Sequence, residues 1–218
     1  MPKGLGASDA PKIARRLGSV SGGRVLDVAT DQGGFIDTLM STLKDYESFV
    51  GIDSCASHNS VEEMREARAH FKGRPVEFLE MDGEDMGFGD GSFDTVCISY
   101  ALHHLDDVDA VLTEMMRVLR PGGLFIIQES YCDGDMKEAQ KVDELEHEWC
   151  ARVDGLLGIT HNKTFTRRRI MEIANGLGLT DLEVFDSDYP IDCLFCERNR
   201  LCEDPKNQAK FHDSIAGV

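Results

Sequence analysis

The sequence predicts an α/β protein built on a doubly wound, mostly parallel sheet, and three observations lead to this fold class. Short apolar runs alternate with segments whose apolar residues recur at helical spacing. The run 124–127 is apolar at every position, which is typical of a central strand buried on both faces. The 218 residues contain no internal repeat, low-complexity tract or proline-rich linker, so we expect a single domain spanning 1–218.

The first part of the chain holds five predicted strands, at 24–28, 48–53, 76–80, 93–99 and 124–127. Helical patterns fill the gaps between them. One follows Gly34, a second opens at Ser60 with a capping box to Glu63, and a third follows Asp107. Strands separated by helices favour parallel pairing with right-handed crossovers.

Beyond residue 130 the pattern changes. Asp135 and Glu138 form a second capping box, and a helix is predicted to about residue 157, with Trp149 on an apolar stripe expected to pack in the core. Thr166 is expected to cap a further helix. Strands near 181–187 and 191–198 are expected to form an antiparallel pair at the sheet edge, which brings the predicted total to seven strands.

Composition excludes several classes of function. The chain has 40 acidic and 23 basic residues, a net charge of −17, so it lacks the basic footprint of a nucleic-acid-binding protein. Residues 75–116 contain eleven acidic residues and no Lys or Arg, which indicates either a solubilising surface or a groove for a cationic ligand. No apolar run approaches the ~20 residues of a membrane span. With no secretory signal visible at the N-terminus, we expect a cytoplasmic protein without a membrane partner.

Seven cysteines, an odd number in a chain of this length, favour reduced thiols over a disulfide framework. Cys193, Cys196 and Cys202, with His212, leave a zinc site open as an alternative. Residues 193 and 196 would point to opposite faces of a regular strand, so no metal site is expected.

The loop after the first predicted strand, Ala29-Thr30-Asp31-Gln32-Gly33, opens a helix. Backbone N–H groups at a helix N-terminus favour a carboxylate or phosphate. Asp53 ends the second strand, where a carboxylate can accept hydrogen bonds from both hydroxyls of a ribose. The pair predicts a nucleoside-containing ligand at the carboxyl edge of the sheet, and without the strict G-x-G-x-x-G pattern a nicotinamide stays an alternative to an adenosyl group.

Five segments, in order, resemble the motifs of class I S-adenosylmethionine (SAM)-dependent methyltransferases, of the small-molecule type. They are Val25 to Gly33, Gly51 to Ser54, Met81 to Met86, Asp90 to Asp94 with the sequel Ile98 to Leu105, and Arg117 to Gly123. The resemblance implies a Rossmann-like methyltransferase fold with a cofactor-binding half at about 20–130. It also implies a helical lid or substrate element at about 132–165, a closing helix and edge strands at 166–198, and a tail at 199–218.

The resemblance also implies which residues hold SAM and release S-adenosylhomocysteine. The expected contacts are Ala29, Thr30, Asp31 and Gly33 with the methionyl and ribose portion, Asp53 and Ser54 with the ribose, Asp82 and Gly83 with the adenine, and Ser99 with the methionyl amine. The chain departs from the family at positions 29 and 31, where glycines are usual. Ala29 is tolerable there if its φ is negative, and Asp31 tolerates a left-handed backbone better than most residues.

The expected chemistry is SN2 methyl transfer to a small-molecule acceptor, achieved mainly by alignment. His104 is the preferred base, with Tyr100 and Glu129 as further catalytic candidates, because all three follow the fourth or fifth strand. His147 and His161 are expected to be surface or loop residues. Alternatives are a non-catalytic SAM- or nucleoside-binding protein, a methyltransferase acting on a protein, and a nicotinamide-dependent oxidoreductase; a homodimer also stays open.

Overall fold

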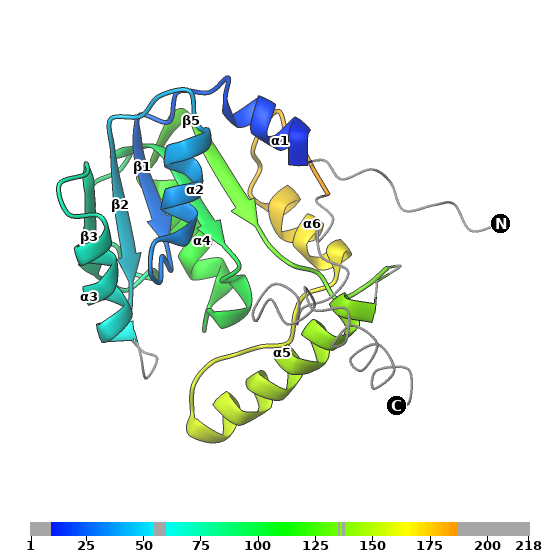
Figure 1. The fold of residues 1–218 in the computed structure, drawn as a ribbon. Coiled ribbons are helices and arrows are strands. Elements are labelled where there is room, and N and C mark those ends of the chain that lie inside the picture. The colour runs from blue at the N-terminus through cyan, green and yellow to red at the C-terminus, as the bar shows by residue number, and fades with distance from the viewer. Residues whose placement is uncertain (1–9, 55–59, 135, 137, 187–218) are drawn as a thin grey trace, which may run out of the picture.

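A computed structural model of the chain describes residues 10–54, 60–134, 136 and 138–186 (Figure 1). Its centre is a sheet of five parallel strands in the order β3-β2-β1-β4-β5. The strands are β1 (Arg24–Val28), β2 (Ser48–Asp53), β3 (Val76–Glu80), β4 (Phe93–Ser99) and β5 (Leu119–Gln128). The predicted parallel α/β fold and its five strands are confirmed, and β5 begins five residues earlier than the apolar run 124–127.

The helices are α1 (Ala10–Leu17), α2 (Gly34–Thr42), α3 (Ser60–His70), α4 (Val108–Val118), α5 (Glu138–Leu157) and α6 (Arg167–Gly176), with a short 3₁₀ helix η1 (Leu102–His104) after β4. Two predicted N-caps are confirmed. The Asp107 carboxylate accepts a hydrogen bond from the Ala110 N–H at 3.0 Å, and the Thr166 hydroxyl accepts one from the Arg169 N–H at 3.1 Å. Each satisfies a donor that the helix leaves free at its start.

Two hydrophobic cores cover the two faces of the sheet. On one face α2 and α3 pack Ile36, Leu39 and Phe71 against Val25 and Phe49. On the other face α4 and α6 bury apolar residues, chiefly Val111, Met115 and Ile173. These pack against the alternate positions of the strands, chiefly Leu26, Val50 and Val96. Helices on both faces of a parallel sheet explain why its strands are apolar throughout.

The far edge of the sheet differs from the prediction. Within the described residues β5 is an edge strand, and its residues 124–127 are only half-buried, so the expectation of a central strand is wrong for this part of the chain. The apolar run correctly predicted a strand that packs against the core, but it could not specify what lies beyond that strand. The described sheet is parallel throughout, and residues 181–186 form no strand; the second strand candidate, 191–198, lies outside the described residues.

Helix α5 stands apart from the helices that cover the sheet (Figure 1). The predicted helix is present, but its apolar stripe is not in the core: Trp149 is 68% exposed and Leu145 65% exposed. The described body meets the other side of the helix, where Ala151 is buried and His147 is half-buried. Helical spacing therefore identified the helix but not the face that would find a partner. None of the described helices is long and apolar enough to cross a membrane.

Candidate functional site

The predicted ligand residues meet at the carboxyl edge of the sheet, around the point where the strand order reverses. Val28 pairs with Ile52 on one side and with Ile98 on the other, so the loops after β1, β2 and β4 are neighbours. Asp53 in turn pairs with Glu80 at the end of β3. In open parallel sheets ligands bind at this switch point, because successive crossovers leave it uncovered by helices.

The loop after β1 is held from below by Asp27. Its side chain is buried, and it accepts a hydrogen bond from the Thr30 hydroxyl at 2.7 Å, while the Cys97 thiol lies 3.4 Å from its other oxygen. Burial raises the pKa of Asp27 to about 6, and these two polar contacts lower it only in part. Asp27 and Thr30 thus fix the loop from inside the fold and leave ligand contact to the residues above them.

Two positions of this loop carry a strained backbone. Ala29 has a φ of +54° and Asp31 a φ of +50°, both in the left-handed region. The condition under which Ala29 would be easily tolerated, a negative φ, is therefore not met, whereas Asp31 adopts the left-handed conformation that Asp tolerates better than most residues. A left-handed alanine costs about 1–2 kcal/mol because its Cβ approaches a carbonyl oxygen. The chain thus keeps the glycine-type loop conformation at positions where its sequence has lost the glycines.

Gly33 closes the loop and precedes the first turn of α2. Its φ is +80°, and a Cβ on it would lie 2.8 Å from the Phe71 ring and 2.9 Å from the Phe78 ring, so glycine is required twice over. At Gly34 no atom beyond the helix itself and its chain neighbours lies within 4 Å of a Cβ, so the space at the start of α2 is open. This is a place where a carboxylate could meet helix N–H groups.

Asp53 faces the same loop from β2. Its carboxylate accepts a hydrogen bond from the Asp31 N–H at 3.2 Å, which joins the two predicted ribose-side residues. Glu63 of α3 is close to both, and its pKa is raised, first by partial burial and then by the charges of Asp31 and Asp53. Three carboxyl groups around one loop create a negative field that suits the cationic portion of an adenosyl sulfonium ligand.

The predicted adenine side follows β3. The Asp82 carboxylate accepts a hydrogen bond from the Glu84 N–H at 2.9 Å, which folds residues 82–84 into a tight turn. Asp82 is exposed, whereas Gly83 is half-buried and a Cβ on it would contact Val111 at 3.4 Å. Ser54 is exposed beside Asp53. These residues have the groups that an adenosine needs, and they lie at neighbouring strand ends.

Gln128 links Ser99 and Tyr100 at the end of β4, and it was not among the site residues predicted from the sequence. Its side chain accepts a hydrogen bond from the Ser99 hydroxyl at 3.1 Å and donates one to the Tyr100 hydroxyl at 3.1 Å. Tyr100 has a φ of +51°, which is rare for an aromatic residue and marks a backbone held in place by its surroundings. Only the register of β4 against β5, which pairs Ser99 with Gln128, could have identified this residue.

Glu129 is fully buried and turned toward backbone. Its carboxylate accepts hydrogen bonds from the Leu102 N–H at 3.0 Å and from the Ser130 N–H at 2.9 Å. It also approaches the His103 Nδ1 to 3.3 Å, without the geometry of a hydrogen bond. Its contacts fix η1 and the end of β5, and they do not reach out toward solvent.

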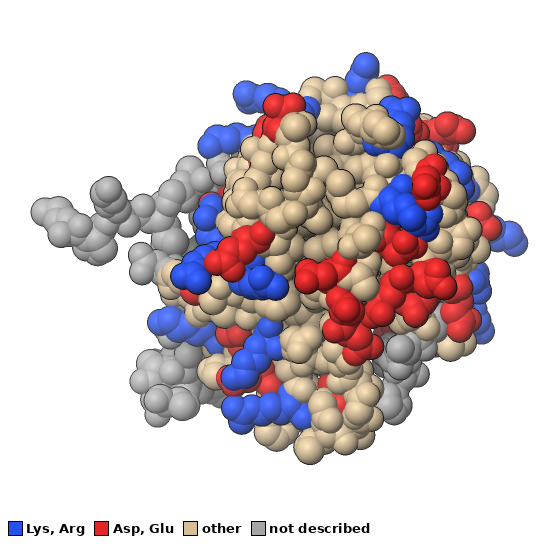
Figure 2. Space-filling model, turned by 180° about the vertical axis from the view of Figure 1, so that it is seen from behind, with Lys and Arg blue, Asp and Glu red and all other residues tan. Residues whose placement is uncertain are grey.

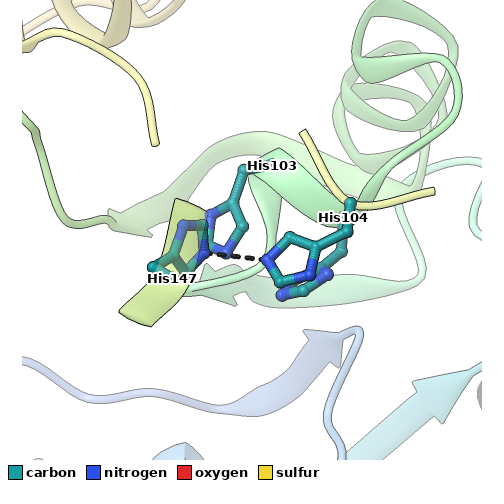
Figure 3. A group of neighbouring side chains, drawn as sticks. His103, His104 and His147 are labelled. Atoms are coloured by element: carbon teal, nitrogen blue, oxygen red, sulfur yellow. Dashed lines mark hydrogen bonds between the residues drawn. The ribbon is translucent and has the colours of Figure 1, made fainter. Parts of the chain in front are cut away.

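Four histidines from three segments converge beside η1. His103 and His104 belong to η1, His147 comes from α5, and His161 from the loop before α6; one ring nitrogen of each lies within 4.8 Å of the others. Figure 3 shows the first three side chains pointing toward a common centre. His161 lies in a loop, as expected, but its side chain is only 6% exposed, and His147 lies on α5 and is half-buried, so neither is a freely exposed surface residue.

The cluster is held by polar contacts on its outer side. Nδ1 of His161 lies 2.7 Å from the Asp154 carboxylate, and Nδ1 of His147 lies 3.0 Å from the Thr164 hydroxyl. The loop between α5 and α6 is tied to η1 by a hydrogen bond from the Asn162 N–H to the His103 carbonyl at 2.7 Å. No short sequence motif joins these positions, so only the fold brings them together.

The electrostatics of the cluster favour the neutral form of His104 and His147. Burial, together with the nearby rings of His103, His161 and His147, lowers the pKa of His104 to about 4. The pKa of His147 is lowered for the same reasons, first by burial. At neutral pH both side chains therefore offer a free nitrogen lone pair.

Comparison with known proteins places the fold in a family. A methyltransferase domain family matches residues 26–127, which include all five strands except the first two residues of β1 and the last residue of β5. Residues 26–127 are thus similar to a SAM-dependent methyltransferase domain. S-adenosylmethionine is the cofactor of this class, and the carboxylates, open helix start and strand-end loops described above fit it.

Curated relatives match over part of their length. The chain is 34% identical over 111 residues to the ubiquinone/menaquinone biosynthesis C-methyltransferase UbiE of Desulfotalea psychrophila, covering 51% of this chain and 43% of that protein. It is 30% identical over 119 residues to the demethylmenaquinone methyltransferase of Lactococcus lactis, covering 55% and 46%. The chain thus spans less than half the length of these relatives.

Solved structures share the fold at lower identity. A putative methyltransferase from Bacillus halodurans has a TM-score of 0.57 and 21% identity, covering 78% of this chain and 68% of that one. A chain from the complex of the Haloferax volcanii Trm112 methyltransferase activator with a putative methyltransferase has a TM-score of 0.62 and 24% identity, covering 84% and 73%. Both similarities concern the fold alone.

Surface charge around the site is uneven. Figure 2 shows Asp and Glu gathered in one region of the face turned away from the view in Figure 1. Most acidic residues of segment 75–116, Asp82 among them, are exposed. The candidate zinc residues Cys193, Cys196, Cys202 and His212 lie outside the described residues.

Proposed function

We propose that this chain transfers the methyl group of SAM to a small-molecule acceptor. The observation that carries the proposal is the meeting of the β1 loop, Asp53 and the β3 and β4 loops at one edge of the sheet. In this arrangement Asp53 and Ser54 hold the ribose, Asp82 and Gly83 the adenine, and the start of α2 the methionyl carboxylate. Ala29, Thr30, Asp31 and Gly33 shape the loop, and Ser99 receives the methionyl amine.

The cofactor supplies a methyl group already activated by the positive charge of its sulfonium. The protein's contribution is therefore alignment of the acceptor with that methyl group, which by itself supplies a large part of the rate. Gln128 serves this purpose by holding Ser99 and Tyr100 together at the end of β4. Tyr100 is half-exposed at 51% and is placed to contact an acceptor.

His104 is the proposed proton acceptor where the acceptor must lose a proton. Its lowered pKa keeps it neutral at physiological pH, so a ring nitrogen is free to accept, although as a base it is weaker than an ordinary histidine. Glu129 acts as a positioning residue, because its buried carboxylate binds the N–H groups that shape η1.

The acceptor side is formed by segment 132–165, which lies beyond the matched residues 26–127. The similarity to quinone-named relatives therefore concerns the cofactor half, and the acceptor of this chain does not follow from it. The exposed acidic region would allow a protein acceptor with a basic tail, which is the second candidate.

Incubation of the purified chain with methyl-labelled SAM and a metabolite extract tests the proposal. Demethylmenaquinone and simple phenols serve as defined acceptors, and a protein extract as the parallel arm. Label in a small organic product, lost in the Asp53→Ala variant, is the expected result. Label only in protein would favour the second candidate, and SAM binding without transfer to any acceptor would leave a binding protein.

A further inference from the structure

The four-histidine cluster is the feature that methyl transfer does not use in full. His103, His104, His147 and His161 present one ring nitrogen each within 4.8 Å of one another, and imidazole nitrogen suits zinc, nickel, copper and iron. Four ligands also match the coordination number of a structural zinc site. Surface histidines without a shared role have no reason to converge from three separate segments.

The outer contacts of the cluster are those of a metal centre. Histidine ligands usually present their second ring nitrogen to a carboxylate, hydroxyl or carbonyl, which fixes the ring and its protonation. Here the Asp154 carboxylate lies 2.7 Å from Nδ1 of His161, and the Thr164 hydroxyl lies 3.0 Å from Nδ1 of His147. Both contacts leave Nε2 turned inward.

The inner nitrogens lack better partners. Nε2 of His147 and Nε2 of His161 are 2.9 Å apart, so the two atoms best placed for a cation face each other. Nδ1 of His103 is buried and has no hydrogen-bond partner in the described part of the chain, while Glu129 lies 3.3 Å away. With Nδ1 of His103 beside the Glu129 carboxylate, as Nδ1 of His161 is beside Asp154, Nε2 of His103 is the nitrogen left for the cluster.

We propose that these four histidines bind one divalent transition-metal ion of the zinc type, which ties α5 and the loop 158–166 to the loop after β4. Metal–nitrogen bonds of about 2.0–2.1 Å would place tetrahedral ligands about 3.3 Å apart. The most widely separated nitrogens therefore need to close by about 1.5 Å at most from the 4.8 Å limit, and the His147–His161 pair, at 2.9 Å, needs to open by about 0.4 Å. Such a shift is within the reach of imidazole rotation.

The ion would fix the acceptor-side element against the cofactor-binding half. The apolar stripe of α5, with Leu145 and Trp149, is exposed, so hydrophobic burial does not hold this side of the helix. Directional contacts at the histidines therefore attach α5 to the cofactor-binding half. A bound ion would use the lone pair that His104 otherwise offers to a proton. In the metal-bound chain His104 is therefore a ligand, and its proposed role as proton acceptor applies only to the metal-free chain. Methyl transfer by alignment does not require that role, and metal binding does not depend on methyl transfer.

Titration of the full, chelator-treated chain with Co²⁺, followed by displacement with Zn²⁺, tests the inference. We expect one ion per chain, with the visible absorption of tetrahedral cobalt and without a sulfur-to-cobalt charge-transfer band. The double variant His147→Gln/His161→Gln should lose at least 100-fold in affinity. Asp154→Asn should lose about 10–100-fold, as outer-shell changes do.

Two matched controls identify the site. His70→Gln removes an exposed histidine that also pairs with a carboxylate, Asp37 at 2.7 Å, and should bind the ion like the unchanged chain. Cys193→Ser/Cys196→Ser should also retain binding. Circular dichroism and S-adenosylhomocysteine binding confirm that each variant is folded. Absence of stoichiometric Co²⁺ binding, or binding lost in the cysteine variant and kept in the histidine variant, would overturn the inference.

Discussion

The cofactor-binding half and the α5 element are attached to the protein in different ways. Its central strands β1, β2 and β4 bury all of their apolar side chains, with Leu26, Val96 and Ile98 at 0% exposure. Helix α5 leaves Trp149 and Leu156 exposed at 68% and 88%. It is joined to the body through histidines, Asp154 and backbone hydrogen bonds. Burial is non-directional and strong in sum, whereas polar contacts fix position and add little net stability.

This difference has a functional meaning. A sheet that is stabilised by a large buried apolar area keeps the cofactor loops in place whichever acceptor binds. An element held by a few directional contacts can be repositioned, or fixed by one further ligand, without unfolding the sheet. One change in each region tests the contrast, and three further changes test the cofactor half.

Removal of a large ring from each region should give the greatest contrast. Phe49 is 1% exposed and packs edge-on against Tyr46, so Phe49→Ala should lower the free energy of unfolding by about 3–5 kcal/mol. Trp149→Ala should change it by no more than about 0.5 kcal/mol. Urea unfolding followed by circular dichroism measures both. Comparable losses in the two variants would show that α5 is buried in solution.

Adding a methyl group to each of two adjacent glycines at the start of α2 should have different effects on stability. Gly33→Ala should destabilise the fold by about 2–4 kcal/mol, because its left-handed φ and the rings of Phe71 and Phe78 both oppose a Cβ. Gly34→Ala is the matched control, since its position is helical and open. It should be neutral or stabilising by up to about 1 kcal/mol. Equal effects in the same unfolding assay would contradict the described loop.

The buried carboxyl group of Asp27 should make stability depend on pH. Its pKa of about 6 in the folded chain exceeds the ordinary 3.8, so the folded state holds the proton more tightly than the unfolded state. Relative to Asp27→Asn, the unchanged chain should therefore lose stability as pH rises from about 4 to about 6, by about 3 kcal/mol at most. Above pH 6 the difference should be constant. A difference that is flat from pH 4 to 7 would show that Asp27 ionises normally.

Restoring a family glycine should have the smallest effect. Ala29→Gly removes the left-handed alanine, and the relief of about 1–2 kcal/mol exceeds the added chain entropy of about 0.5–1 kcal/mol. The net result should be stabilisation by up to about 1 kcal/mol. Ala69→Gly, on the exposed side of α3, is the control and should destabilise by about 1 kcal/mol. A loss of stability in both variants would argue against the positive φ at Ala29.

The cofactor half could be predicted from the sequence because its signals are local. Apolar runs identify strands, Asp107 caps the helix that follows it, and Asp53 ends the strand that lies beside the first loop. The sign of φ at Ala29 could not be predicted, because loop conformation is set by the packing of Gly33 and Asp27 around it and not by residue type alone.

The acceptor side could not be predicted in the same way because its signals are distant in sequence. Periodicity identified α5, but which face is buried depends on the chain around the helix. The apolar stripe that was predicted to be buried is exposed. His147 and His161 lie on segments with no motif linking them to His103 and His104. Their convergence depends on how the loop between α5 and α6 returns to η1. The catalytic roles of His104, Tyr100 and Glu129 stay predictions.

Calorimetric titration with SAM, S-adenosylhomocysteine and NADH tests the central claim most directly. The edge of the sheet around Asp53 should bind the first two at micromolar concentration and not the third. Asp53→Ala should weaken SAM binding more than tenfold, as expected when charged hydrogen bonds to a ribose are lost, whereas Glu77→Ala, on the exposed side of β3, should not. Unchanged SAM affinity in a folded Asp53→Ala protein, or no binding of either adenosyl ligand by the unchanged chain, would contradict the account.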